Sequence, residues 1–175
     1  MSTQKPITHF IAGIIVAAIQ IIYSLALLFS GIKQGGPTGW IAYCILVISL
    51  AVFVNMYGKA NHYQLSFGNL FGYGFKATAI AMLIVIGFTL ILFTAMPDLK
   101  EKIFDEARKQ MEEQNKLSDE EIDKALSIAK KFFYVFMVGG ILLTYAILGA
   151  IGSLIGAAIT KKNPYNPLDQ LDMKQ

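Results

Sequence analysis

Four stretches of the chain contain no Asp, Glu, Lys or Arg and consist mainly of Ile, Leu, Val, Phe and Ala. They run from Phe10 to Ser30, from Trp40 to Tyr57, from Ala77 to Met96 and from Phe132 to Thr160. A helix needs about 20 residues to cross a hydrocarbon layer roughly 30 Å thick, and within that layer only helices and closed barrels satisfy their backbone polar groups. The pattern therefore predicts an all-α, polytopic membrane protein with four transmembrane helices.

The turn and breaker residues between these stretches set the expected boundaries. Gly31, Gly35, Gly36 and Pro37 form a breaker-rich turn after the first stretch, and Pro97 ends the third. We expect one integral membrane domain over residues 1–175, with spans at about 8–31, 39–57, 70–96 and 132–160. The first apolar run is too long for the core of a secretory signal peptide, so we expect it to be a retained helix.

Residues 98–131 differ sharply in composition, with ten acids and eight bases in 34 residues. Apolar residues recur along the first part, at Leu99, Ile103, Ala107 and Met111, which predicts an amphipathic helix. The segment Ser118 to Glu121 reads as a capping box that starts a second helix. We expect the two helices to form an antiparallel hairpin outside the bilayer.

The second arm of this hairpin has its own apolar stripe and no obvious stop. Its stripe consists of Ile122, Ala125, Leu126 and Ala129, which can face the first arm. Because neither Gly nor Pro occurs between Ser118 and Gly139, we expect the arm to continue directly into the last span. Such continuity would transmit tilt or rotation from the hairpin to that span.

Small residues at a spacing of four are concentrated in the last span. Gly152 and Gly156 form a GxxxG, and Gly149 and Ser153 repeat the spacing. In lipid, such pairs let two helix backbones approach closely. The pattern has two interpretations, a homodimer seam or packing within the chain against the first span, where Gly13 and Ala17 offer the same spacing; we favour the second.

Polar side chains inside the spans are few and none is acidic. Ion-coupled carriers commonly place an ionisable residue or a broken helix near the midplane, which this chain does not show. Gln20 lies nearest to mid-membrane, and we expect its amide to bond to a neighbouring helix rather than to line a polar path. The single cysteine, Cys44, is expected to be a buried small hydrophobe.

The composition argues against several other function classes. The net charge is only +3, and most of the bases are interleaved with acids, so a nucleic-acid interface has no support. The two histidines, His9 and His62, have no further ligand at metal-binding spacing. We therefore expect no metal, no cofactor and no enzymatic activity.

Three segments carry a resemblance to a known family. They are LSFGNLFGYGF from Leu65 to Phe75, the charged run from Met96 to Leu126, and GSLIGAAITKK from Gly152 to Lys162. Together they resemble the domain of unknown function 4199 family, which is made up of small four-helix membrane proteins of bacteria. The resemblance implies the same fold and a place in the bacterial inner membrane. That family has no established activity, so the resemblance transfers no site.

The distribution of Lys and Arg bears on orientation. Four spans place both termini on one side, with six bases, while Lys33 and the eight bases of the hairpin lie opposite. The raw count puts the termini outside. We nevertheless prefer cytoplasmic termini, because the hairpin bases are interleaved with acids in a folded body, whereas Lys161 and Lys162 stand unopposed after the last span.

These patterns favour a non-enzymatic structural or interaction protein of the bacterial inner membrane. The 98–131 hairpin would bind a protein partner or a second copy of the chain, and the lipid bilayer surrounds the spans. The alternative is a small oligomeric transporter or channel. It would need Gln20, Ser24, Asn55 or Thr144 to converge on a wet cavity.

Overall fold

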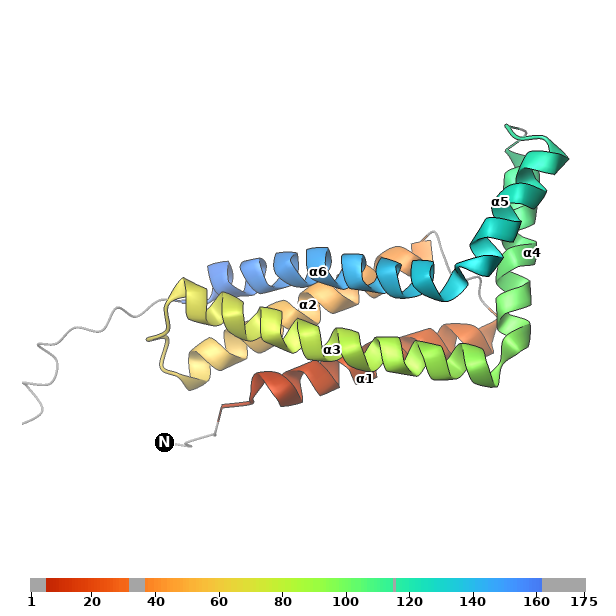
Figure 1. Cartoon of the computed structure of the whole chain (residues 1–175). Helices are drawn as coiled ribbons and strands as arrows, with labels where there is room; N and C mark the ends of the chain where they lie inside the picture. The colour runs from red at the N-terminus through yellow and green to blue at the C-terminus, as the bar shows by residue number, and fades with distance from the viewer. Residues whose placement is uncertain (1–5, 32–36, 115, 162–175) are drawn as a thin grey trace, which may run out of the picture. The chain divides into compact units, whose positions relative to one another are not determined.

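A computed structural model describes residues 6–31, 37–114 and 116–161 of the chain. These residues form six helices: α1 (His9–Ser30), α2 (Pro37–Ala60), α3 (Phe67–Ala95), α4 (Pro97–Glu113), α5 (Asp119–Lys131) and α6 (Phe133–Ile159) (Figure 1). By length and composition α1, α2, α3 and α6 can each cross a membrane, and α4 and α5 lie between the third and fourth of them. The all-α, four-span prediction is therefore confirmed. Gly35 and Gly36 of the predicted turn, together with Lys33 and Lys162, lie outside the described residues.

The third span is longer than its charge-free core suggested. Helix α3 begins at Phe67 because Ser66 caps it, its hydroxyl accepting a hydrogen bond from the Asn69 backbone N–H at 3.2 Å. With 29 residues it is longer than the 27 residues of α6, whereas the expected ranges, 70–96 and 132–160, made the last span the longer of the two. At 1.5 Å per residue α3 is about 44 Å long, more than the hydrocarbon thickness.

The chain forms two compact units. The first contains α1, α2, the part of α3 up to Met82 and the part of α6 from Thr144. The second contains the rest of α3, both hairpin helices and the start of α6. Both units belong to a continuous chain, and the single integral membrane domain over 1–175 stays a prediction.

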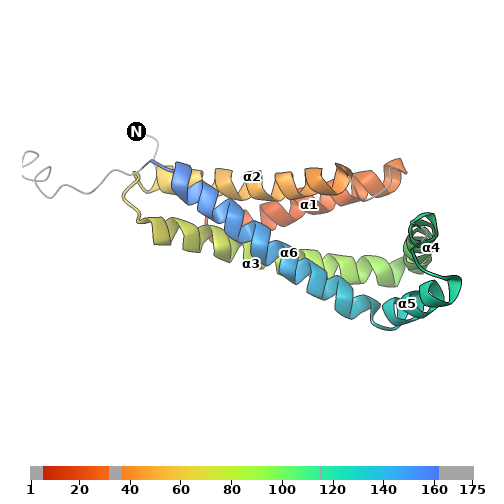
Figure 2. The same ribbon diagram turned by 90° about the horizontal axis from the view of Figure 1, so that it is seen from above.

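In the first unit, α1 and α2 lie side by side (Figure 2). Two side chains of α1 bond to backbone carbonyls of α2: the Gln20 amide donates to Ala42 and the Tyr23 hydroxyl to Thr38, each at 2.9 Å. Such interhelical bonds remove polar groups from contact with lipid. The expected fate of Gln20 is thus confirmed.

The second unit contains the hairpin, whose helices α4 and α5 contact each other around a small apolar core. Phe104, Ile122 and Leu126 are buried in it, and Ala107, Met111, Ala129 and Phe133 pack against them. This confirms the predicted hairpin but corrects one position: Ile103 is 43% exposed, and Phe104 takes its place. A stripe of every fourth residue drifts by about 40° per step around a helix of 3.6 residues per turn, so it cannot stay on one face.

The expected continuity between the hairpin and the last span was wrong. Helix α5 ends at Lys131, and Phe132 leaves helical geometry with φ −106° and ψ 19° before α6 starts at Phe133. The Phe133 ring packs edge-on against Phe93 and Phe104, with centroids 5.1 and 5.6 Å apart. Consecutive bulky aromatic residues have low helix propensity, which favours a break at this point. The break lets the Phe133 side chain enter the hairpin core.

The hairpin core gives a test with a matched control on one helix. We expect Ile122→Ala, at a side chain 1% exposed, to destabilise the hairpin by about 2–5 kcal/mol, because it leaves a cavity. Ile128→Ala, at a side chain 48% exposed, should cost less than about 0.5 kcal/mol. Hydrogen exchange of the α4 and α5 amides in the detergent-solubilised full-length protein measures both. Equal effects would contradict the assigned core.

Candidate functional site

The glycines of α6 mark where its backbone meets α2 in the first unit. A Cβ added at Gly152 would lie 3.0 Å from the Val47 carbonyl oxygen, and one at Gly156 would lie 2.9 Å from the Ala51 Cα. Both glycines are buried, and the atoms nearest to an added Cβ are backbone atoms and β-carbons of α2, which side-chain rotation cannot move aside. Only glycine allows this approach, which is the way small residues promote packing in lipid.

A reciprocal pair of small residues joins α6 to α3. A Cβ at Gly74 of α3 would lie 2.6 Å from the Ser153 Oγ, and a Cβ at Gly149 of α6 would meet the Thr78 side chain. Each hydroxyl therefore sits over the glycine of the opposite helix. Each also donates to its own helix, Ser153 to the Gly149 carbonyl at 2.6 Å and Thr78 to the Gly74 carbonyl at 2.9 Å.

The small residues of α1 face α3. A Cβ at Gly13 would lie 2.6 Å from the Ala77 carbonyl oxygen, and Ala17 is completely buried. The contacts at the α6 glycines are thus made with α2 and α3, and the expected pairing of α6 with the first span is corrected. The spacing of small residues within one helix does not specify which helix it packs against. A signal for α3 was nevertheless present, since the G-x-x-x-T of Gly74 and Thr78 matches the G-x-x-x-S of Gly149 and Ser153.

The polar side chains of the spans do not meet at one place. Gln20 bonds near the start of α2, whereas Asn55, later on that helix, donates to the Thr160 hydroxyl at 3.5 Å. Ala42 and Asn55 are about 20 Å apart along the helix at 1.5 Å per residue. The wet cavity required by a transporter would need them to converge, and these two do not.

Cys44 is exposed, which corrects the expectation that it is buried. It lies on the second span, so its thiol is on a surface that faces outward from the packed helices. An apolar thiol is tolerated there, because lipid is as apolar as a protein interior.

An aromatic group links the start of α1 to α2 and α3. The Tyr73 ring stacks on Tyr57 with centroids 4.0 Å apart and meets His9 edge-on at 6.5 Å. Its hydroxyl donates to the Ile7 carbonyl at 3.0 Å. His9 therefore packs against an aromatic ring, and within the described ranges no three His, Cys, Asp or Glu side chains are grouped to hold a metal ion.

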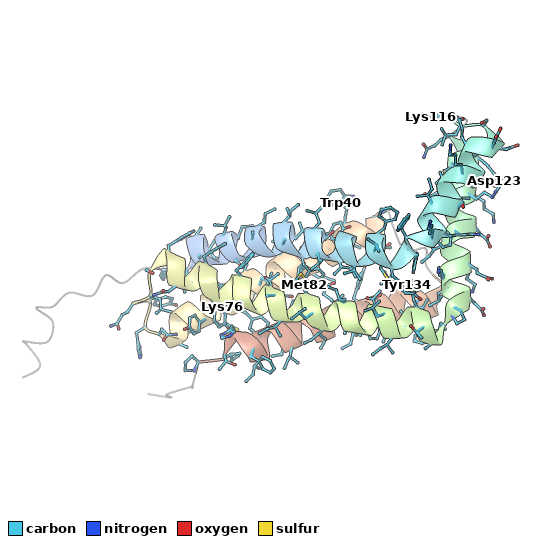
Figure 3. The ribbon with its side chains drawn as sticks, viewed as in Figure 1. Trp40, Lys76, Met82, Lys116, Asp123 and Tyr134 are labelled. Carbon is cyan, nitrogen blue, oxygen red and sulfur yellow. The ribbon has the colours of Figure 1, made fainter. Side chains whose placement is uncertain are left out.

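The hairpin carries every carboxylate among the described residues, all of them between Asp98 and Asp123. Segment 107–123, around the turn, has six acids and three bases. Arg108 of α4 pairs with Asp123 of α5 and with Glu112 of its own helix, the latter at 3.5 Å. Figure 3 shows Lys116 and Asp123 in this part of the hairpin and Tyr134 where α6 begins.

An open pocket of about 270 Å³ lies between α4 and α5. It is lined by two apolar residues, Phe104 and Leu126, and by the polar residues Asp105, Arg108, Asp123, Ser127 and Lys130. Two carboxylates and two bases balance in charge, so the pocket does not favour an ion of either sign.

The start of α5 has the predicted capping box, which is confirmed. The Ser118 hydroxyl accepts from the Glu121 N–H, while the Glu121 carboxylate accepts from the Ser118 N–H at 2.8 Å and from its hydroxyl at 2.9 Å. The bond from the Ser118 N–H, followed by the bond from its hydroxyl, lowers the pKa of the Glu121 carboxyl. A lowered folded-state pKa means that the cap is intact at neutral pH and is lost only as the pH falls through that value.

The packing of α6 against α2 predicts that replacing glycine by alanine has opposite effects on protein stability at two positions of α6. We expect Gly156→Ala to destabilise the protein by about 1–3 kcal/mol, because the new methyl group must push α6 away from α2. At Gly139 an added Cβ meets nothing within 4 Å, so Gly139→Ala should stabilise by up to about 1 kcal/mol through helix propensity. Thermal unfolding in detergent measures both. A loss of stability from Gly139→Ala as large as that from Gly156→Ala would contradict the assigned contact between α6 and α2.

Comparison with known proteins agrees with this architecture. A family model described as a protein of unknown function, DUF4199, matches residues 10–162, which cover all four spans and the hairpin. The chain shows no significant similarity to any curated protein or to any solved structure. The resemblance in the three sequence segments is therefore confirmed, and the chain belongs to the DUF4199 family.

Proposed function

We propose that this chain is a non-enzymatic interaction protein of the bacterial inner membrane whose α4–α5 hairpin binds a partner protein outside the bilayer. The four spans anchor it, and the hairpin carries all the carboxylates of the described residues and most of their bases. The proposed partner has a basic surface, because segment 107–123 carries six acids against three bases.

The observation that carries this proposal is the hairpin's own apolar core. Phe104, Ile122 and Leu126 bury one face of each helix, which leaves the charged side chains exposed on the others. A helix pair with an internal core holds its surface groups in fixed positions, which lowers the ordering cost of binding. A segment that only linked two spans would need neither the core nor the capping box.

The proposed orientation places the termini in the cytoplasm. Lys59 and Lys161 lie at the ends of α2 and α6 on the side of the termini, with no acid beside them in the described residues. Positive residues close to span ends favour the cytoplasmic side. The hairpin bases, by contrast, belong to a folded body that carries a net negative charge.

Partner capture with charge-reversed variants tests the binding surface. We expect cross-linking of the tagged full-length protein in native membranes to capture a basic partner that Glu113→Lys/Glu120→Lys loses by tenfold or more. The control Lys109→Glu/Lys124→Glu, also on the hairpin surface, should retain it. Capture that is unchanged in both variants, or lost in both, would argue against an acidic binding surface.

Cysteine labelling tests the orientation. In a Cys44→Ser background, Lys116→Cys on the hairpin should react with a membrane-impermeant maleimide in spheroplasts, because the hairpin is proposed to lie outside the cytoplasm. Lys59→Cys, at the end of α2, should react only after lysis. The reverse pattern would place the termini outside and overturn the proposed orientation.

A further inference from the structure

We propose that the membrane end of the hairpin is a binding site for the headgroup of an anionic phospholipid. Three lysines form the site and are called the basic collar: Lys100 at the start of α4, and Lys130 and Lys131 at the end of α5. This inference does not depend on the partner proposed above, which would use the acidic segment around the turn.

Each lysine of the basic collar lies over an aromatic ring. The Lys100 Nζ is 5.0 Å from the Phe133 ring centroid and 5.3 Å from that of Tyr134. The Lys130 Nζ is 5.4 Å from the Phe104 centroid, and the Lys131 Nζ is 5.5 Å from the Phe132 centroid. These cation–π contacts hold the ammonium groups without neutralising them.

The charges of the basic collar remain available to a ligand. Within the part of the chain that the structure describes, the ion pairs involve Arg108, and no carboxylate oxygen lies within 4.0 Å of these three amines. Lys130 lines the same pocket as Asp105 and Asp123, but it forms no ion pair with either of them. An ammonium group has three donors, so each lysine can face its ring and still donate to a phosphate oxygen.

The position of the basic collar matches the headgroup level. Lys100 is five residues beyond the end of the third span at Ala95, and Lys131 is two residues before the fourth span begins at Phe133. Basic residues next to a span attract the anionic headgroups of the leaflet that they face over about a Debye length, and in the proposed orientation this is the leaflet opposite the cytoplasm. Aromatic residues gather at the same level in membrane proteins.

The neighbouring surface has the chemistry of a lipid rather than of a free anion. Phe132, Tyr134, Val135 and Phe136 are all exposed, directly after the two lysines of α5. A lipid meets both demands at once, because its phosphate faces the lysines while its acyl chain covers the apolar side chains. Because these side chains lie at the start of the fourth span, the lysines are next to the surface that lipid covers.

Native mass spectrometry of the full-length protein in detergent tests the site. We expect phosphatidylglycerol to bind more tightly than phosphatidylcholine. The variant Lys100→Gln/Lys130→Gln/Lys131→Gln should lower the affinity for phosphatidylglycerol by about 100-fold, because each lysine contributes a factor of about five. The matched control, Lys109→Gln/Lys116→Gln/Lys124→Gln, removes three other hairpin lysines and should change the affinity less than fivefold. Lys→Arg at the three collar positions keeps charge and ring contact and should retain binding.

Three results would overturn the proposal. The first is equal affinity for the two lipids, and the second is an equal loss of affinity in the collar and control variants. The third is displacement of the lipid by millimolar inorganic phosphate, which would assign the lysines to a general anion site. Retained binding in the arginine variant shows that a loss in the glutamine variant reflects charge and not misfolding.

Discussion

The close approach of the α6 backbone to α2 and α3 is the interaction on which the first unit depends. In lipid the hydrophobic effect does not drive helices together, so van der Waals contact between backbones has to replace it. Gly152 and Gly156 allow that contact with α2, and Gly149 leaves room for the Thr78 side chain of α3. A side chain at any of these positions would displace a helix, because most of the opposing atoms belong to backbone or to buried branched residues.

The same seam explains why the interior of this unit has hydroxyl groups but little reactive chemistry. Ser153, Thr78 and Thr160 each donate to the carbonyl four residues earlier in their own helix. No buried side-chain nitrogen or oxygen of the described residues lacks a hydrogen-bond partner. These hydroxyls are thus small, satisfied packing groups, and the charged chemistry of the chain is concentrated in the hairpin.

Within the hairpin, charge and apolar surface vary along its length. Near the spans, lysines lie over aromatic rings beside exposed apolar residues, which suits the boundary between water and lipid. Around the turn, carboxylates predominate and the capping box fixes the start of α5. The break at Phe132 lets Phe133 join the hairpin core, so one aromatic residue links the start of the last span to the extramembrane helices.

The number of spans, the hairpin and its capping box could be predicted from the sequence, because long charge-free runs and the Ser118 to Glu121 signature act through neighbouring residues. The sequence did not show which helices pack together, because the spacing of glycines is the same whichever helix they face. The folded structure was needed to show that α6 meets α2 and α3, that Phe104 replaces Ile103 in the hairpin core, and that the chain leaves helical geometry at Phe132. Each of these depends on contacts between residues far apart in the chain, which local periodicity does not encode.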